Sequence, residues 1–329
     1  MSEPLLAASD LVTRLFTDSG VVHAVDGVSL HIGHGEAVAL VGESGCGKSM
    51  TALSLMRLVR PPGRIVSGNV TFDGTDLLTL PEREMRAVRG GRLAMVFQDP
   101  MTFLNPLMRV GEQIVEAIML HQRLDRTAAR ASALDSLERV GIPAAKSVID
   151  YFPHQLSGGM RQRMLIAMAI SSTPKLLIAD EPTTALDVTI QAQIMRLLAR
   201  LRRELSSSML LITHDLGLVA EYCDRVYVMY AGRIVEEGDV YSIFADPRHP
   251  YTRALLSSTL SPDRRIETLA PIEGQPPNLI TPPTGCRFHP RCANRMPRCS
   301  AEAPPNFAVA PGASARCWLY EEAARVAAP

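Results

Sequence analysis

"GESGCGKS", residues 42–49, is the stretch that decides the fold of this chain. It matches the pattern G-x-x-x-x-G-K-[ST], follows the apolar run EAVALVG (36–42) and precedes MTALSLMRLV (50–59), which has a helical pattern. Glycines at these places let backbone N–H groups wrap a phosphate, and the start of the next helix adds the positive end of its dipole. This strand–loop–helix context predicts a nucleotide-binding loop rather than a chance glycine-rich turn.

Two side chains of the loop have specific expected roles. Lys48 is predicted to reach the β- and γ-phosphates, and Ser49 to ligate Mg²⁺. Lysine is rare here, since Lys48 is one of only three among 34 basic residues, and its compact charge suits this place. Cys46 occupies a variable position and needs no role. The predicted ATP contacts of the loop are Gly42, Glu43, Ser44, Gly45, Cys46, Gly47, Lys48 and Ser49.

Short apolar runs alternate with helical patterns along most of the chain. Strands that are apolar throughout and separated by helices indicate an α/β domain with a largely parallel, buried sheet. The stretch from about 106 to 165 is almost wholly helical in pattern, so we predict a helical subdomain there. The expected strands are 36–42, 93–99, 175–181, 209–215 and 225–232, and two of the clearer helices are 127–142 and 188–205.

Two acidic residues end the predicted strand LLIAD (176–180) and its continuation EP. Asp180, at the carboxyl end of a buried strand, suits coordination of Mg²⁺, and Glu181 is placed to polarise an attacking water as a general base. Two acidic residues at the end of a strand are by themselves weak evidence for a catalytic site. With the phosphate loop upstream, the evidence becomes strong.

A second glycine-rich helix start is found in QLSGGMRQR (155–163). Ser157, Gly158 and Gly159 precede a helical run, and the start of a helix can bind phosphate. Since the first loop already serves one nucleotide, these residues are predicted to contact a nucleotide held by another subunit.

With these motifs the chain resembles the ATPase subunit of an ATP-binding cassette (ABC) transporter. In the order typical of that family it has Walker A at 42–49, a glutamine loop at Gln98, Walker B ending at Asp180 and Glu181, and a switch histidine at His214. The signature departs from the family's LSGGQ at its last place, where Met160 replaces glutamine. The signature residues are Leu156, Ser157, Gly158, Gly159 and Met160, and the D-loop residues are Ala185, Leu186 and Asp187.

The resemblance implies a P-loop NTPase fold with a RecA-like core, an antiparallel β subdomain and a helical subdomain. It also implies a head-to-tail dimer in which the signature of one subunit closes over the ATP of the other. Gln98 would ligate Mg²⁺ beside Ser49 and Asp180, and His214 would hold the γ-phosphate and the attacking water. Phe16 is the candidate for stacking on adenine, with a place in the core as the alternative.

Beyond residue 232 the chain resembles the oligopeptide and dipeptide import branch, in GRIVEEGDVYSIFADPRHPYTRALLSS (232–258), IEGQPPNL and GCRFHPRC. We therefore expect a nucleotide-binding domain at 1–245 and a C-terminal extension at 246–329. The implied partners are a second, homologous ATPase, two membrane permeases and an extracytoplasmic binding protein, with this chain peripheral on the cytoplasmic face. Import of nickel or another small solute remains an alternative.

Four cysteines gather in that extension: Cys286, Cys292, Cys299 and Cys317. Their gaps are wider than the C-x₂₋₄-C pairs of zinc sites, and relatives in this branch carry a [4Fe–4S] cluster, so a cluster is the prediction. Zinc, or thiols without metal, are the alternatives. His289 could replace one ligand.

Composition excludes other classes of protein. The formal net charge is zero, which gives no field for binding nucleic acid, and no heptad run is present. This argues against a soluble cassette ATPase of translation or DNA repair. The start of the chain lacks a signal peptide, and no apolar run reaches the roughly 18 residues of a membrane span. We expect a cytoplasmic protein.

Overall fold

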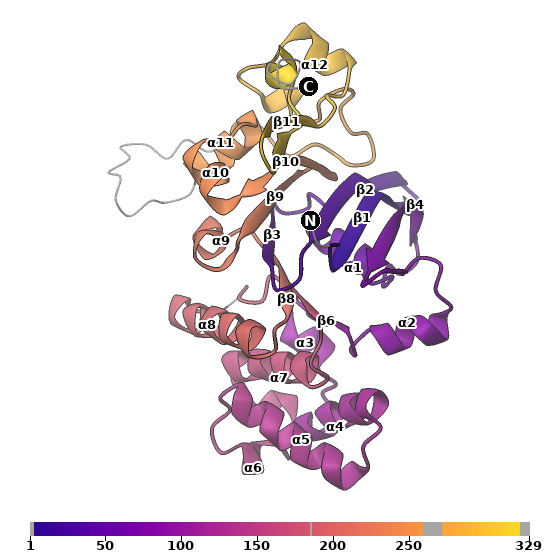
Figure 1. Cartoon of the computed structure of the whole chain (residues 1–329), viewed down its shortest axis with the longest axis vertical. Helices are drawn as coiled ribbons and strands as arrows, with labels where there is room; N and C mark the ends of the chain where they lie inside the picture. The colour runs from indigo at the N-terminus through magenta and orange to yellow at the C-terminus, as the bar shows by residue number, and fades with distance from the viewer. Residues whose placement is uncertain (1–2, 185, 259–271, 323–329) are drawn as a thin grey trace. The chain divides into compact units, whose positions relative to one another are not determined.

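The computed structural model describes residues 3–184, 186–258 and 272–322, which form two compact units. The first consists mainly of Gly33–Glu36 and Thr79–Ile212, and the second of Pro4–Ile32, Ala37–Leu78 and the chain from Thr213 onward. Most of the helices and strands of both units are labelled in Figure 1.

Parallel strands form the centre of the first unit. β6 (Leu93–Val96) pairs with β7 (Leu176–Asp180), and β7 pairs with β8 (Ser208–Thr213), all in parallel register. Every residue of these strands is buried, as expected for parallel strands covered on both faces. Asp180 therefore lies at the carboxyl end of β7, the edge at which ligands bind in sheets of this kind.

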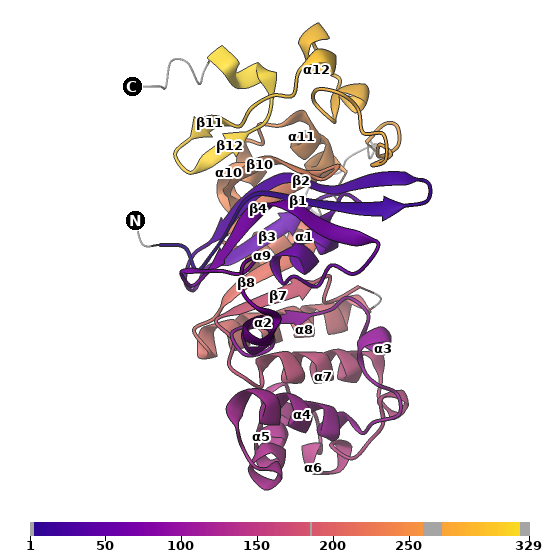
Figure 2. The same cartoon turned by 90° about the vertical axis from the view of Figure 1, so that its right-hand side faces the viewer.

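Helices make up the rest of the first unit. α4 (Val110–Gln122), α5 (Arg126–Arg139) and α7 (Gly158–Ile170) pack against one another, as Figure 2 shows, so the predicted helical subdomain is confirmed. α8 (Val188–Glu204) buries one face, through Ile194, Leu198 and Leu201 among others. The short helices are α2 (Glu82–Val88), α3 (Pro100–Phe103), α6 (Ala145–Val148) and the 3₁₀ turn η1 (Pro153–Gln155).

The second unit contains the predicted antiparallel β subdomain. Its strand order is β2-β1-β4-β5, with every pair antiparallel. Successive side chains along a strand point to opposite faces, so Leu6, Ala8, Val70 and Phe72 are buried while Ala7 and Thr71 between them are only partly buried. The bounds are β1 (Leu6–Thr17), β2 (Gly20–Ile32), β4 (Gly63–Phe72) and β5 (Thr75–Asp76).

A second sheet of this unit carries the phosphate loop at one end and the C-terminal region at the other. β3 (Ala37–Val41) pairs in parallel with β9 (Arg225–Tyr230), and β9 pairs antiparallel with β10 (Arg233–Asp239). β12 (Ala313–Ala315) then pairs with β10, and β11 (Phe307–Ala310) with β12. Residues of the predicted extension thus continue the sheet that holds β3. Within this extension, 259–271 and 323–329 lie outside the described residues.

The helices of the second unit are short. α1 (Lys48–Leu55) follows the phosphate loop, and α11 (Pro250–Ser257) begins with a proline whose fixed φ suits the first turn. The others are α9 (Leu216–Tyr222), α10 (Val240–Ala245), α12 (Pro297–Ala301) and the 3₁₀ turns η2 (His289–Arg291) and η3 (Trp318–Tyr320). Across the described ranges of both units, none of the helices combines the length and apolarity needed to cross a membrane.

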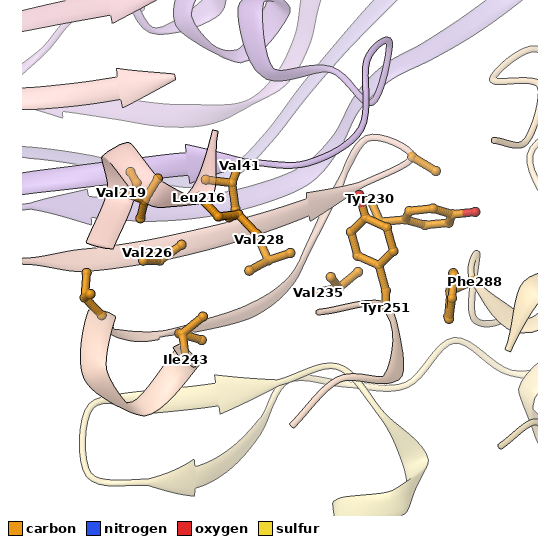
Figure 3. Close-up of a cluster of buried hydrophobic side chains, with 13 residues drawn as sticks. Val41, Leu216, Val219, Val226, Val228, Tyr230, Val235, Ile243, Tyr251 and Phe288 are labelled. Carbon is orange, nitrogen blue, oxygen red and sulfur yellow. The ribbon is translucent and has the colours of Figure 1, made fainter. Parts of the chain in front are cut away.

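A hydrophobic core joins the cassette part of this unit to its C-terminal region (Figure 3). Phe288 packs against Tyr230 of β9 and Tyr251 of α11, with ring centres 5.2 and 5.4 Å apart. All three rings are nearly or fully buried. Large buried aromatics contribute strongly to stability, so these contacts fix the segment around Phe288 onto the end of β9.

Candidate functional site

The phosphate loop has the backbone shape that its glycines predict. Gly42, Gly45 and Gly47 have φ angles of 155°, 75° and 111°. A Cβ atom on Gly42 would lie 2.1 Å from the carbonyl oxygen of Met229, and one on Gly47 would lie 2.2 Å from that of Ala24. Any side chain at these two places would therefore displace the loop.

Lys48 lies across the loop. Its Nζ donates hydrogen bonds to the carbonyl oxygens of Gly42 and Glu43, at 2.8 and 3.1 Å, and the residue is buried. α1 begins at Lys48 after Gly47, which supplies no side-chain cap to the first N–H groups of the helix. A nest of backbone N–H groups with one lysine ammonium fits the phosphates of a nucleotide.

Cys46 has a packing role in this loop. It is buried, its N–H donates to the carbonyl of Glu43, and its own carbonyl accepts from the N–H of Gly232. Burial raises the pKa of the thiol to about 11, so the thiol is protonated at neutral pH. Ser44 and Gly45, by contrast, are exposed at the tip of the loop, and Ser49 lies in the first turn of α1.

The first unit brings Gln98 and Glu181 together. The Nε2 of Gln98 donates to the Oε2 of Glu181 at 2.9 Å, and the hydroxyl of Thr184 donates to the same oxygen at 2.9 Å. Asp180, the neighbouring acid, is buried at the end of β7. Glu181 has a φ of 45°, the left-handed region that costs a non-glycine residue free energy and is found at functional sites. Its carboxylate therefore has a fixed orientation.

The signature residues begin α7. Ser157 caps this helix, because its Oγ accepts from the N–H of Met160 at 3.3 Å. Leu156 is buried, whereas Ser157 and Gly158 are exposed. A Cβ on Gly159 would lie 3.0 Å from Cγ2 of Ile190, so this glycine permits close contact with α8. The helix start is thus open to a ligand from outside the unit.

The D-loop residue Asp187 caps α8, since its Oδ1 accepts from the N–H of Ile190 at 2.9 Å. Ala185, predicted to belong to the same loop, lies outside the described residues. His214 directly follows β8 and is exposed, and the next residue, Asp215, caps α9. Lys48, Ser49 and His214 belong to the second unit, so their assembly with Gln98, Asp180 and Glu181 is part of the proposal below.

Phe16 lies near the end of β1 with 40% of its surface exposed. The guanidinium carbon of Arg64 lies 4.2 Å from the centre of its ring. One face of the ring is therefore covered by a cation–π contact, and stacking of adenine on the ring remains a prediction.

The four cysteines of the C-terminal region line one small cavity, together with Phe288 and Trp318 among others. The cavity measures about 10 Å³, enough for about one water molecule. Burial raises the pKa of the Cys286 and Cys317 thiols to about 11, so both are protonated at neutral pH in the chain without metal.

The prediction of a [4Fe–4S] cluster is wrong, because the side chains that the structure describes are not arranged to hold one. Over residues 3–184, 186–258 and 272–322, no group of three or more histidine, cysteine, aspartate or glutamate side chains is arranged to hold a metal ion. The same finding leaves zinc without a site in these residues. His289, the suggested substitute ligand, instead places its Nδ1 2.9 Å from the carbonyl oxygen of Cys286, in a local turn. The four thiols do line one cavity, but Cys299 and Cys317 are buried there and Cys286 and Cys292 only partly buried, without the arrangement of a metal site.

Sequence reasoning missed one set of contacts at the phosphate loop. The N–H of Glu43 donates to the hydroxyl of Tyr251 at 2.9 Å, and Arg291 contacts the carboxylate of Glu43 at 2.7 Å. These residues come from the C-terminal region, more than 200 positions away along the chain. No local pattern in the sequence could have indicated them.

Comparison with known families gives two matches. A family model described as "ABC transporter" matches residues 25–184, and one described as "Oligopeptide/dipeptide transporter, C-terminal region" matches residues 235–299. The chain is 49% identical to the oligopeptide transport ATP-binding protein OppD of Bacillus subtilis, covering 99% of this chain and 92% of that protein. It is 48% identical to the dipeptide transport ATP-binding protein DppD of Escherichia coli, covering 95% and 96%. Neither name mentions an iron–sulfur cluster.

Solved structures of ATP-binding cassettes have folds similar to that of this chain. The chain is similar to the dimeric ATP-binding cassette MJ0796 in a post-hydrolysis state bound to ADP and Pi, with a TM-score of 0.65 and 26% identity over 71% of this chain and 98% of that one. It is also similar to cbiO1 of Clostridium perfringens, from the transporter complex cbiONQ, with a TM-score of 0.62 and 29% identity over 74% and 92%. The predicted cassette fold is confirmed.

Proposed function

This chain belongs to the ATP-binding proteins of the ABC transporter family, in the oligopeptide and dipeptide branch, and is an ATPase of that type; we propose that it powers the import of peptides across the cytoplasmic membrane. The observation that carries the proposal is likeness over nearly the whole chain to peptide-transport proteins, including the C-terminal region at 235–299. We place the boundary between the nucleotide-binding domain and the extension near residue 245.

ATP binds, in this proposal, at residues 42–49. Backbone N–H groups of the loop surround the phosphates, and Lys48 turns its ammonium from the loop carbonyls toward the β- and γ-phosphates. Ser49, Gln98 and Asp180 hold Mg²⁺, which neutralises charge on the phosphate oxygens. Phe16 stacks on the adenine by the face that Arg64 leaves uncovered.

Hydrolysis uses Glu181 as the general base for the attacking water. Hydrogen bonds from Gln98 and Thr184 converge on the Oε2 of this carboxylate and orient it toward the attacking water. His214, exposed at the end of β8, holds the γ-phosphate and the water in place. Proton transfer from the water requires a base within reach of the water and a fixed orientation of the water relative to that base.

The second half of each ATP site comes from another subunit. Ser157, Gly158 and Gly159 lie at a helix start that contacts no nucleotide of its own chain in this arrangement, and they close over the ATP of the partner. The exposure of Ser157 and Gly158 supports this use, as does the likeness to a cassette solved as a dimer. ATP binding then closes the dimer and hydrolysis releases it.

We propose that the chain works as one of two homologous ATPases beneath two membrane permeases, which receive peptides from an extracytoplasmic binding protein. It is peripheral on the cytoplasmic face of the membrane, and the helices at about 106–165 contact the permeases. No nucleic acid takes part.

The test reconstitutes the ATPases, permeases and binding protein in liposomes and measures ATP hydrolysis. Peptide-loaded binding protein is expected to stimulate hydrolysis several-fold, and Lys48→Ala is expected to abolish turnover. The matched control is Lys175→Ala, at the exposed residue that precedes β7 and lies outside 106–165, and we expect it to keep turnover at the wild-type rate. Stimulation by nickel or another small solute, without any response to peptides, would overturn the proposed cargo.

A further inference from the structure

Arg291 links the C-terminal region to the phosphate loop. It ends the 3₁₀ turn η2, and only 5% of its side chain is exposed. Its Nη1 donates to the Oε2 of Glu43 at 2.7 Å, and its Nη2 to the Oε1 at 3.0 Å. This bidentate geometry is the strongest form of the arginine–carboxylate pair, and it fixes orientation as well as distance.

The other donors of Arg291 are also used. Nε donates to the carbonyl of Glu273 at 2.9 Å, Nη2 to that of Ile272 at 3.3 Å, and Nη1 to the hydroxyl of Tyr230 at 3.3 Å. A guanidinium has five N–H donors, and these five contacts account for all of them. Arg291 therefore connects the segment at 272–273, the end of β9 and the phosphate loop at a single point.

Glu43 is held at each of its polar groups. Its carboxylate accepts from Arg291, its N–H donates to the hydroxyl of Tyr251 at 2.9 Å, and its carbonyl accepts from Lys48 at 3.1 Å. Because Glu43 is the second residue of the loop, these bonds fix the position of the backbone at the start of the loop. Two of the three come from residues beyond position 250.

The pair also sets the charge beside the loop. The side chain of Glu43 is 21% exposed, so its carboxylate is largely shielded from water. Loss of the guanidinium would leave an unpaired negative charge next to the phosphate site, which destabilises the loop and repels ATP. Loss of both charges removes the repulsion. The effect of Arg291 should thus depend on the presence of the Glu43 carboxylate.

We propose that Arg291 is a positioning residue for the phosphate loop: through Glu43 it holds the loop in its ATP-binding shape, so that the C-terminal region sets the affinity of the cassette for ATP. This inference rests on the proposed binding of ATP at residues 42–49. Phe288 packs on the rings of Tyr230 and Tyr251 independently of the bond between Arg291 and the Tyr230 hydroxyl, so we expect the C-terminal region to stay attached when Arg291 is replaced.

The test compares the KM for ATP and the kcat of the reconstituted transporter carrying Arg291→Met, Glu43→Gln or both changes. Arg291→Met keeps the length of the side chain without the charge, and we expect it to raise KM about tenfold with kcat within about twofold. Glu43→Gln, which loses the charged partner, is expected to raise KM about threefold. The double variant should also show about threefold, well below the product of the single effects.

The matched control is Arg298→Met. Arg298 belongs to the same C-terminal region but pairs with Glu302 and Glu321, and we expect KM and kcat to stay at their wild-type values. Should Arg291→Met not assemble, Arg291→Lys retains the charge without the bidentate geometry and is expected to raise KM about threefold.

An unchanged KM in the assembled Arg291 variants would overturn the inference, as would effects that multiply in the double variant. Failure of the proposed function gives a different pattern, since wild type would then hydrolyse ATP no faster than Lys48→Ala.

Discussion

Gln98 donates a hydrogen bond to the carboxylate of Glu181 at 2.9 Å, across 83 positions of the chain. The two residues follow β6 and β7, which pair in parallel register, so both side chains lie beyond the same edge of the sheet. Thr184 donates to the same oxygen at 2.9 Å. The arrangement orients a carboxylate whose backbone is already in the left-handed region, and it makes the function of Glu181 open to direct test.

Glu181→Gln should bind ATP with near wild-type affinity and hydrolyse it about 10² to 10³ times more slowly, because an amide cannot accept the proton of the attacking water. Steady-state hydrolysis by the assembled transporter, with ATP binding measured separately, checks this. Glu204→Gln is the control, since Glu204 ends α8 and its side chain is 45% exposed beside Arg200. Unchanged turnover in Glu181→Gln would remove this residue from the role of base.

Thr184→Val should lower kcat several-fold and leave the KM for ATP unchanged. The substitution keeps the shape of the side chain but removes a hydrogen bond that orients the Glu181 carboxylate, a loss typically of about 1 kcal/mol. The effect should disappear in a Glu181→Gln background, where no base remains to be oriented. Equal kcat in Thr184→Val and wild type would show that the hydrogen bond from Thr184 does not contribute to turnover.

Asp26 should contribute stability that is lost in acid. Burial tends to raise its pKa, but Arg287, Arg14 and Arg233 outweigh this effect and lower it to about 2. The contribution, about 2 kcal/mol, is fully present above the ordinary pKa of 3.8 and is lost as the pH falls toward 2. Denaturant unfolding of wild type and Asp26→Asn at pH 5 and pH 2.5 measures it. A difference in unfolding free energy that stays constant between these pH values contradicts the prediction.

His249 should make the protein sensitive to milder acid. The side chain is 1% exposed, and burial lowers its pKa to about 3. The unfolded state therefore takes up a proton below pH 6.5 that the folded state does not, and stability falls from pH 6.5 down to about 3. At pH 5 the expected loss is about 2 kcal/mol. His249→Gln, compared with wild type by thermal unfolding at pH 7.5 and 5, should show a smaller loss of stability on acidification; an equal loss contradicts the prediction.

The sequence motifs predicted the local parts of the site. Gly42 and Gly47 have the backbone angles that a phosphate loop needs, and the β7 strand ends at Asp180 as its apolar pattern indicated. Each of these features depends on a few adjacent residues, so a short sequence motif is enough to predict it. The pairing of Gln98 with Glu181 also follows from two neighbouring parallel strands.

The features that the sequence did not predict depend on contacts between segments that lie far apart along the chain. The pair of Arg291 and Glu43 joins residues 248 positions apart, and nothing near either residue indicates the other. The cysteines gather as their spacing suggested, but the spacing does not record how deeply the thiols are buried. In the described residues, no group of three or more histidine, cysteine, aspartate or glutamate side chains is arranged to hold a metal ion, and for that reason the metal prediction was wrong.

The most direct test of the central claim is uptake of a labelled peptide into liposomes that contain the complete transporter, with wild type and Glu181→Gln compared at equal assembly. The account predicts that uptake by the wild type requires ATP, and that Glu181→Gln lowers it to the level seen without ATP. Peptide uptake that continues at the wild-type rate in Glu181→Gln would contradict the claim that hydrolysis by this chain powers import.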